Sequence, residues 1–112
     1  TLPVLTLDPE LEQLFNDLVT RSQNPDEIAL EPSLADGLFT STREAIDELE
    51  RKELPAVLVV SPIIRAWLSK LLRRVTKDLT VLSYVEIPDD QPISVTSTIS
   101  IKREEATNAG QQ

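Results

Sequence analysis

The spacing of apolar residues changes several times along the chain and divides it into segments of different type. Residues 2–7 form a short run with strand propensity, and Asp8 and Pro9 follow as a helix N-cap and a first helical residue. The next apolar residues repeat at the helical spacing i, i+3, i+4 and i+7: Leu11, Leu14, Phe15 and Leu18. This pattern predicts a helix that begins at residue 9 and ends near residues 21–24.

A longer amphipathic segment begins at Pro32 and continues to Leu54. Pro55 ends it, because a proline disfavours helical backbone in the residue before it. Gly37, in the first turns, weakens this helix by about 1 kcal/mol relative to alanine. The apolar stripe consists of Leu34, Leu38, Ala45, Ile46 and Leu49.

Two segments with strand character flank a third helix. Residues 56–60 are continuously apolar and rich in valine, which is typical of a buried central strand. Ser61 and Pro62 are a suitable N-cap and first residue for a helix that continues to about residue 77. Residues 79–87 have the β-branched and aromatic content of a further strand.

The last predicted strand covers residues 93–101 and alternates in polarity. Its apolar residues are expected on one face and its serines and threonines on the other, which predicts a half-exposed strand. Residues 88–92, Pro-Asp-Asp-Gln-Pro, are turn formers, so we expect strands 79–87 and 93–101 to form an antiparallel hairpin. The apolar set is Ile93, Val95, Ile99 and Ile101.

The predicted fold class is therefore α/β, in the order strand, helix, helix, strand, helix, strand, strand. Helical crossovers place the first three strands parallel, and the hairpin adds an antiparallel fourth strand. We expect one mixed sheet with helices packed on it, formed by residues 1–101. Residues 102–112 are polar and without periodicity, which predicts a disordered tail.

Composition restricts the chemistry of this domain. The 112 residues include no Cys and no His, so thiolate and imidazole ligands for zinc are absent, as is the commonest general base near neutral pH. With only two glycines, the chain contains neither of the glycine-rich loops that hold nucleotide phosphates. No cofactor and no metal are predicted.

Three acidic residues near the last turn raise the question of a carboxylate active site. Catalysis by Glu86, Asp89 or Asp90 requires an apolar pocket that raises one carboxyl pKa, and nothing in the sequence supplies it. Two aspartates between Pro88 and Pro92 are better explained by side chains that hydrogen-bond their own backbone in a turn. No catalytic residue is predicted.

Charge is distributed unevenly between the two halves of the chain. Residues 1–54 carry thirteen acidic and four basic side chains, within a net charge of −8 for the whole chain. This excess repels nucleic acid and attracts basic proteins. Two sets of charged residues are candidates for partner binding: Asp36, Glu44, Asp47, Glu48 and Glu50 in the second helix, and Arg65, Lys70, Arg73, Arg74 and Lys77 in the third.

Several segments together resemble the C-terminal cytoplasmic subdomain of the FlhA/LcrD family of type III secretion export-gate proteins. These are Leu-Asp-Pro-x-Leu-Glu from Leu7, Glu-Pro-x-Leu-Ala from Glu31, Ser-Pro-x-x-Arg from Ser61 and Val-Leu-Ser-Tyr-x-Glu-Ile-Pro-Asp-Asp from Val81. Their order is specific as an ensemble, and the resemblance covers about residues 2–101. The Leu-Asp-Pro and Glu-Ile-Pro-Asp-Asp segments favour the flagellar branch of the family.

The resemblance implies a docking and gating role in protein export, without catalysis. It implies a piece of an inner-membrane protein whose membrane spans precede Thr1 and whose cytoplasmic part forms a nonameric ring. The implied partners are chaperone-substrate complexes and the stalk protein of the export ATPase.

Three alternatives remain open from the sequence. The chain resembles the virulence branch of the family as well as the flagellar branch. A small enzyme on the same α/β scaffold is a second alternative, because a fold does not determine a function. A purely structural ring-forming module is the third.

Overall fold

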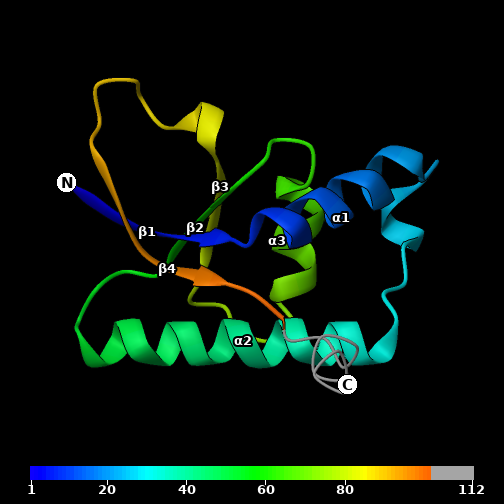
Figure 1. Ribbon diagram of the computed structural model, residues 1–112, viewed down its shortest axis with the longest axis horizontal. Coiled ribbons are helices and arrows are strands. Elements are labelled where there is room, and N and C mark those ends of the chain that lie inside the picture. The colour runs from blue at the N-terminus through cyan, green and yellow to red at the C-terminus, as the bar shows by residue number, and fades with distance from the viewer. Residues whose placement is uncertain (102–112) are drawn as a thin grey trace, which may run out of the picture.

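The computed structural model describes residues 1–101 as one sheet with three α-helices packed against it (Figure 1). The helices and strands follow the predicted order. Their bounds are β1 (Leu2–Leu7), α1 (Pro9–Arg21), α2 (Pro32–Arg51), β2 (Val57–Val60), α3 (Arg65–Leu72), β3 (Thr80–Ser83) and β4 (Ile93–Ile99), with short 3-10 helices at Pro25–Glu27 and Tyr84–Glu86. The predicted polar tail, residues 102–112, lies outside the described residues.

The sheet has the strand order β3-β2-β1-β4, and every pair in it is parallel. The predicted mixed sheet with an antiparallel C-terminal hairpin is therefore wrong. β4 does not pair with β3; it lies at the opposite edge, beside β1. The central position predicted for residues 56–60 is confirmed, because β2 lies between β1 and β3.

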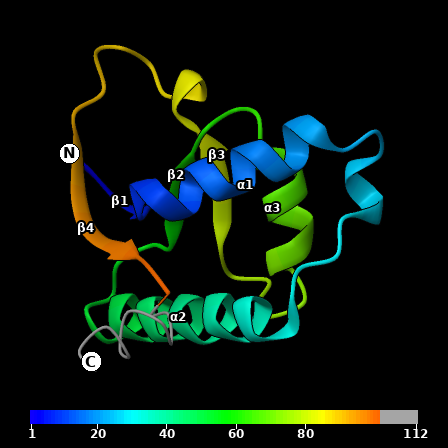
Figure 2. The same cartoon turned by 45° about the vertical axis from the view of Figure 1, so that its right-hand side comes forward.

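The twist of the sheet explains how a short connection joins its two edges. Figure 1 shows β3 running upward and β4 running downward to the right, with β2 and β1 at intermediate orientations. This progressive rotation follows from the right-handed twist of strands. It brings the end of β3 and the start of β4 to the same end of the sheet, so residues 84–92 cross over with only the short 3-10 helix 84–86 and no α-helix (Figure 2). Turn-forming residues alone did not reveal this crossing.

A β-bulge changes the faces of the last strand. Val4 pairs with Val95 whereas Leu5 pairs with Ser97, so Thr96 is an additional residue in β4. The Thr96 hydroxyl donates to the Val4 carbonyl oxygen over 3.0 Å. Because the bulge inverts the alternation, Ile99 is buried on one face while Val95 lies on the other. The expectation of one continuous apolar face in this strand was wrong for that reason.

One buried cluster joins the sheet to all three helices. The register partners Leu58 and Val81 belong to it, as does Leu5 opposite Leu58. Between α1 and α3, the rings of Phe15 and Trp67 meet edge to face with their centroids 5.2 Å apart. Trp67 is thus a core residue, and the helices are held mainly by apolar burial.

The helix starts depend on local signals to different degrees. Asp8 caps α1 as predicted, its Oδ2 accepting from the amides of Glu10 (3.1 Å) and Leu11 (3.3 Å). α3 begins three residues later than predicted, at Arg65, because the Ser61 hydroxyl and carbonyl close a turn with the amides of Ile63 and Ile64.

Gly37 has a packing role in α2. The chain beyond β4 crosses this helix, and a Cβ at Gly37 would lie 2.7 Å from Cγ2 of Ile101. Nearby, the Ser41 hydroxyl donates to the Ser100 carbonyl oxygen over 2.7 Å. The glycine that weakens the helix therefore allows residues 100–101 to approach it closely.

We expect Gly37→Ala to give none of the stabilisation normally gained from alanine in a helix. The new methyl group overlaps the stiff, branched side chain of Ile101, and this clash offsets a propensity gain of about 1 kcal/mol. In an Ile101→Ala background, which lacks Cγ2, the same substitution should stabilise by about 1 kcal/mol. Urea denaturation of the four proteins of this double-mutant cycle measures the difference, and an equal gain in both backgrounds would contradict the packing role.

Glu86 lies just after β3, and its side chain binds a backbone amide at the end of this edge strand. Its carboxylate accepts from the backbone amide of Ser83 over 2.8 Å, and the two residues form a capping box for the 3-10 helix 84–86. Hydrogen bonding from Ser83 is the main cause that lowers the pKa of Glu86, with a smaller contribution from Arg65, 3.3 Å away. The strand predicted for residues 79–87 consequently stops at Ser83.

The lowered pKa of Glu86 predicts a pH-dependent contribution to stability. Above the ordinary glutamate pKa of 4.5, the ionised carboxylate favours the folded state, and this contribution is lost as the pH falls through the folded-state pKa. Glu86→Gln should therefore lower the thermal midpoint at pH 7 and lower it less in acid. Asp89→Asn, an exposed carboxyl in the next turn, is the control. A wild-type to Glu86→Gln difference that does not shrink in acid would refute the assignment.

Candidate partner-binding surfaces

The described residues contain no arrangement typical of a metal or carboxylate active site. Within residues 1–101, no three or more Asp and Glu side chains lie close enough to hold a metal ion. Glu86 is engaged in the cap, and Asp89 and Asp90 are exposed in a turn closed by the Gln91 amide on the Pro88 carbonyl oxygen (3.0 Å). No helix in this part of the chain is long and apolar enough to cross a membrane.

The structure divides the predicted acidic set of α2 into two groups. In the first group, Asp47 lies 3.4 Å from the Arg43 guanidinium, and Glu48 pairs with Arg51 and, at 3.5 Å, with Lys52. The hydrogen bond and charge of Arg51, followed by the charge of Lys52, lower the pKa of Glu48. These pairs are solvent-exposed and contribute little to stability, and residues 43–53 still carry five acidic against three basic side chains. Glu50 is exposed beside them.

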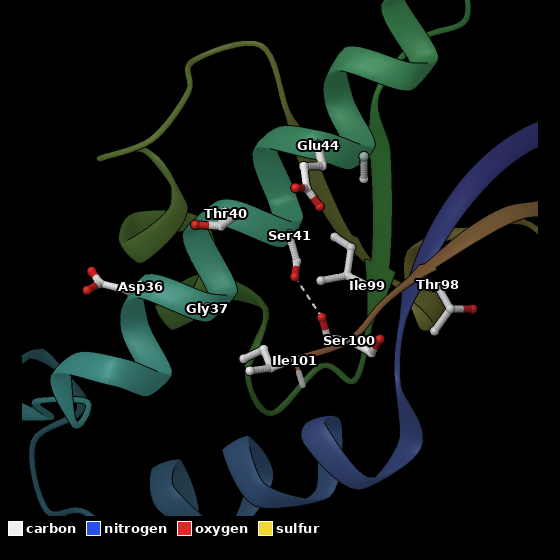
Figure 3. Close-up of a pocket in the computed structure, with 10 residues that line it drawn as sticks. Asp36, Gly37, Thr40, Ser41, Glu44, Thr98, Ile99, Ser100 and Ile101 are labelled. Atoms are coloured by element: carbon white, nitrogen blue, oxygen red, sulfur yellow. Dashed lines mark hydrogen bonds between the residues drawn. The ribbon is translucent and has the colours of Figure 1, made fainter. Parts of the chain in front are cut away.

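The second acidic group lines a groove. Asp36 and Glu44, two helical turns apart on α2, border an open groove of about 620 Å³ whose opposite wall is residues 98–101. Figure 3 shows the Glu44 carboxylate near Ser41 and Ile99, whereas the Asp36 side chain, at the other end, points away from the wall formed by residues 98–101. Among the ion pairs of the described residues, neither Asp36 nor Glu44 has a basic partner.

The predicted basic set is also distributed over separate surroundings. Arg65 faces Glu86, and Lys70 lies 3.2 Å from Asp26. Arg73 and Lys77, with Arg65, line a second groove of about 630 Å³ between α3 and β3. Arg74 borders a smaller pocket of about 130 Å³ together with Lys70 and Trp67. The five basic residues therefore divide between two pockets, with Arg65, Arg73 and Lys77 in one and Lys70 and Arg74 in the other.

The sequence analysis did not identify the large apolar side chains that are exposed on the described part of the chain. They are Ile63, Tyr84, Val85, Ile93 and Val95, and the last two are 45% and 55% exposed on β4. The alternation of residues 93–101 predicts that the side chains of Ile93 and Val95 pack inward, on the same face as Ile99. Only the bulge, which the sequence does not mark, places Ile93 and Val95 on the opposite face from Ile99.

Known proteins resemble this chain over almost its whole length. The FHIPEP family matches residues 1–92. The flagellar biosynthesis protein FlhA of Yersinia enterocolitica is 37% identical over 100 residues, covering 89% of this chain and 14% of that protein. FlhA of Salmonella typhimurium is 38% identical over 88% of this chain and 14% of its own length, and the low calcium response locus protein D of Yersinia pestis is 33% identical over 77% and 12%. This chain thus spans about one seventh of the relatives it matches.

Solved structures agree with the fold. The Chlamydia pneumoniae CdsV protein has a TM-score of 0.70 at 26% identity, over 87% of this chain and 27% of the other. The Shigella flexneri MxiA protein has a TM-score of 0.66, also at 26% identity, over 88% and 30%. The resemblance found in the sequence is confirmed by these matches: this chain belongs to the FHIPEP family, whose matching members include FlhA and the low calcium response protein D.

Proposed function

We propose that this domain is a non-catalytic docking and gating module of a type III protein export apparatus, in the flagellar branch. Family membership is the observation that carries the proposal. FlhA of Yersinia enterocolitica, Salmonella typhimurium and Buchnera aphidicola match at 36–38% identity and FlhA of Bacillus subtilis at 27%, all over 99–100 residues, whereas the virulence relative matches at 33% over 86 residues. A virulence system is the second candidate on the strength of that weaker match.

A docking role also agrees with the side chains of the domain. All the candidate charged residues except Glu50 lie in exposed ion pairs or line open pockets, and the candidate carboxylates near the last turn are capped or exposed. None of the matching proteins named above carries an enzyme name. Surfaces of this kind are suited to reversible contacts with other proteins.

The proposed setting is the cytoplasmic face of the bacterial inner membrane. There the domain is one part of a larger chain that assembles as a nonameric ring and receives chaperone-substrate complexes and the stalk protein of the export ATPase. One neighbour of similar fold, SctV-C of EPEC, has been solved as a nonamer, with a TM-score of 0.59 at 18% identity. This likeness supports the fold, and the ring and its partners belong to the proposal.

Deletion of this domain from the full-length protein in its own bacterium should abolish export and leave ring assembly intact. The expected result is loss of flagellar export substrates from the culture medium, with unchanged membrane foci of a fluorescently tagged export-gate protein. Loss of the foci would instead support a purely structural, ring-forming role. Normal export by the deletion strain would contradict the proposal altogether.

Within this function, we propose that the exposed end of α2 attracts a basic coiled-coil partner over a long range. Exchanging Asp47, Glu48 and Glu50 for lysine should slow association with the ATPase stalk protein about tenfold at low ionic strength, and much less at high salt, because screening removes long-range attraction.

A matched variant separates local from overall charge. Exchanging Asp78, Asp89 and Asp90 for lysine alters the net charge equally but at exposed positions outside α2. Stopped-flow association rates at several salt concentrations, with circular dichroism as the folding check, compare the two variants. Equal slowing by both, or an unchanged salt dependence in the α2 variant, would exclude this surface.

A further inference from the structure

The two edges of the sheet differ in how far they are open to another strand. β3 has only four residues, and the carboxylate of Glu86, itself paired with Arg65, occupies the amide of Ser83. β4 has seven residues, Ile-Ser-Val-Thr-Ser-Thr-Ile, with no charge, proline or glycine among them. Edge strands normally carry such residues because an open edge pairs readily with other chains.

The backbone of β4 directs free hydrogen-bonding groups away from the sheet. The Leu2 amide donates to the Pro92 carbonyl oxygen over 2.9 Å, and Leu2 and Val4 are the register partners of Ile93 and Val95. In a parallel pair, successive residues direct their backbone groups to opposite sides. The amides and carbonyls of Ile93 and Val95 therefore point outward, beside side chains that are about half exposed.

The open edge leads into the acidic groove. Residues 98–101, at the end of β4, form one wall of the groove that Asp36 and Glu44 line from α2 (Figure 3). The hydrogen bond from Ser41 to the Ser100 carbonyl oxygen fixes this wall against the helix. No basic side chain of residues 1–101 pairs with Asp36 or Glu44, so within this part of the chain the end of the edge carries negative charge without an ion-pair partner.

We propose that the free edge of β4 binds an extended segment of a partner protein by strand addition, with basic residues of that segment in the acidic groove. The added strand runs antiparallel to β4, the more stable pairing, so its basic residues stand at its N-terminal end. Alternating small apolar side chains of the segment cover Ile93 and Val95. This inference rests on the edge and the groove and does not depend on the export function.

A synthetic peptide tests the proposal directly. The probe is Lys-Lys-Ser-Val-Thr-Val-Ser-Val with a C-terminal fluorophore, long enough to pair with a strand of about six residues. Fluorescence anisotropy with the full chain should show saturable binding, and the amide NMR signals of Ile93 and Val95 should shift most. Replacing the two lysines of the probe by glutamates should weaken binding by about tenfold or more, as should Glu44→Lys in the protein.

The backbone contribution is tested on both partners. Val95→Pro removes an outward amide at an edge position, where proline is tolerated, and should reduce binding about tenfold while circular dichroism stays unchanged. N-methylation of every second amide of the probe, in the two possible phases, should abolish binding in one phase only. Equal effects of the two phases would overturn strand addition without relying on any protein variant.

Other occupants of the edge give distinct results, and each would overturn the proposal. Tighter probe binding by a chain that ends at Ile101 would identify residues 102–112 of the same chain as the occupant. Concentration-dependent dimerisation that Val95→Pro abolishes would identify a second copy. Loss of export after deletion of the domain, combined with no probe binding, would leave the proposed function standing and discard the strand-addition site.

Discussion

The parallel pairing of β1 with β4 determines which surfaces of the domain are left free. It joins the two ends of the described chain, since Leu2–Leu7 pairs with Ile93–Ile99. The register is fixed at both ends by hydrogen bonds, from the Leu2 amide to the Pro92 carbonyl oxygen and from the Asp8 amide to the Ile99 carbonyl oxygen. The residues that follow β4 therefore cross α2. The open edge, the acidic groove and the need for Gly37 all follow from this one pairing.

How much of the fold the sequence predicted depends on the range of each interaction. Asp8 and Pro9 set the start of α1 through contacts within three residues, and the uninterrupted apolar run 57–60 indicates burial wherever its neighbours lie. The strand that β4 pairs with could not be predicted in this way. Pro88, the two aspartates and Pro92 favour a turn, but they do not determine which edge of the sheet the next strand joins. That choice is made by the twist of the sheet and by Glu86, which ends β3 early.

The candidate partner-binding residues remain a prediction, and what the sequence leaves open is what each of them faces in the fold. The ten charged residues are predicted because they gather on two expected helices, yet their effect depends on what faces them. Glu48 is surrounded by Arg51 and Lys52 from its own helix, whereas Glu44, one turn earlier, faces the end of a strand more than fifty residues away in the sequence. Intrahelical neighbours can be derived from i, i+3 and i+4 spacing. The groove beside Glu44 exists only in the tertiary fold. The exposure of Ile93 and Val95 depends on a bulge that no residue in the strand predicts.

The contrast between the edges gives the strongest reason to regard β4 as a binding element. An open edge strand promotes unwanted association, and the other edge of the same sheet shows how few residues suffice to close it: one glutamate on an amide, one arginine beside the glutamate and an early end to the strand. β4 carries none of these protections along its outward residues Ile93 and Val95. Its bulge at Thr96 twists the strand without blocking the amides that precede it. A strand that is longer, uncharged and continuous with an acidic groove has the chemistry required of a site for an extended basic segment, and stability of the isolated domain does not require that chemistry.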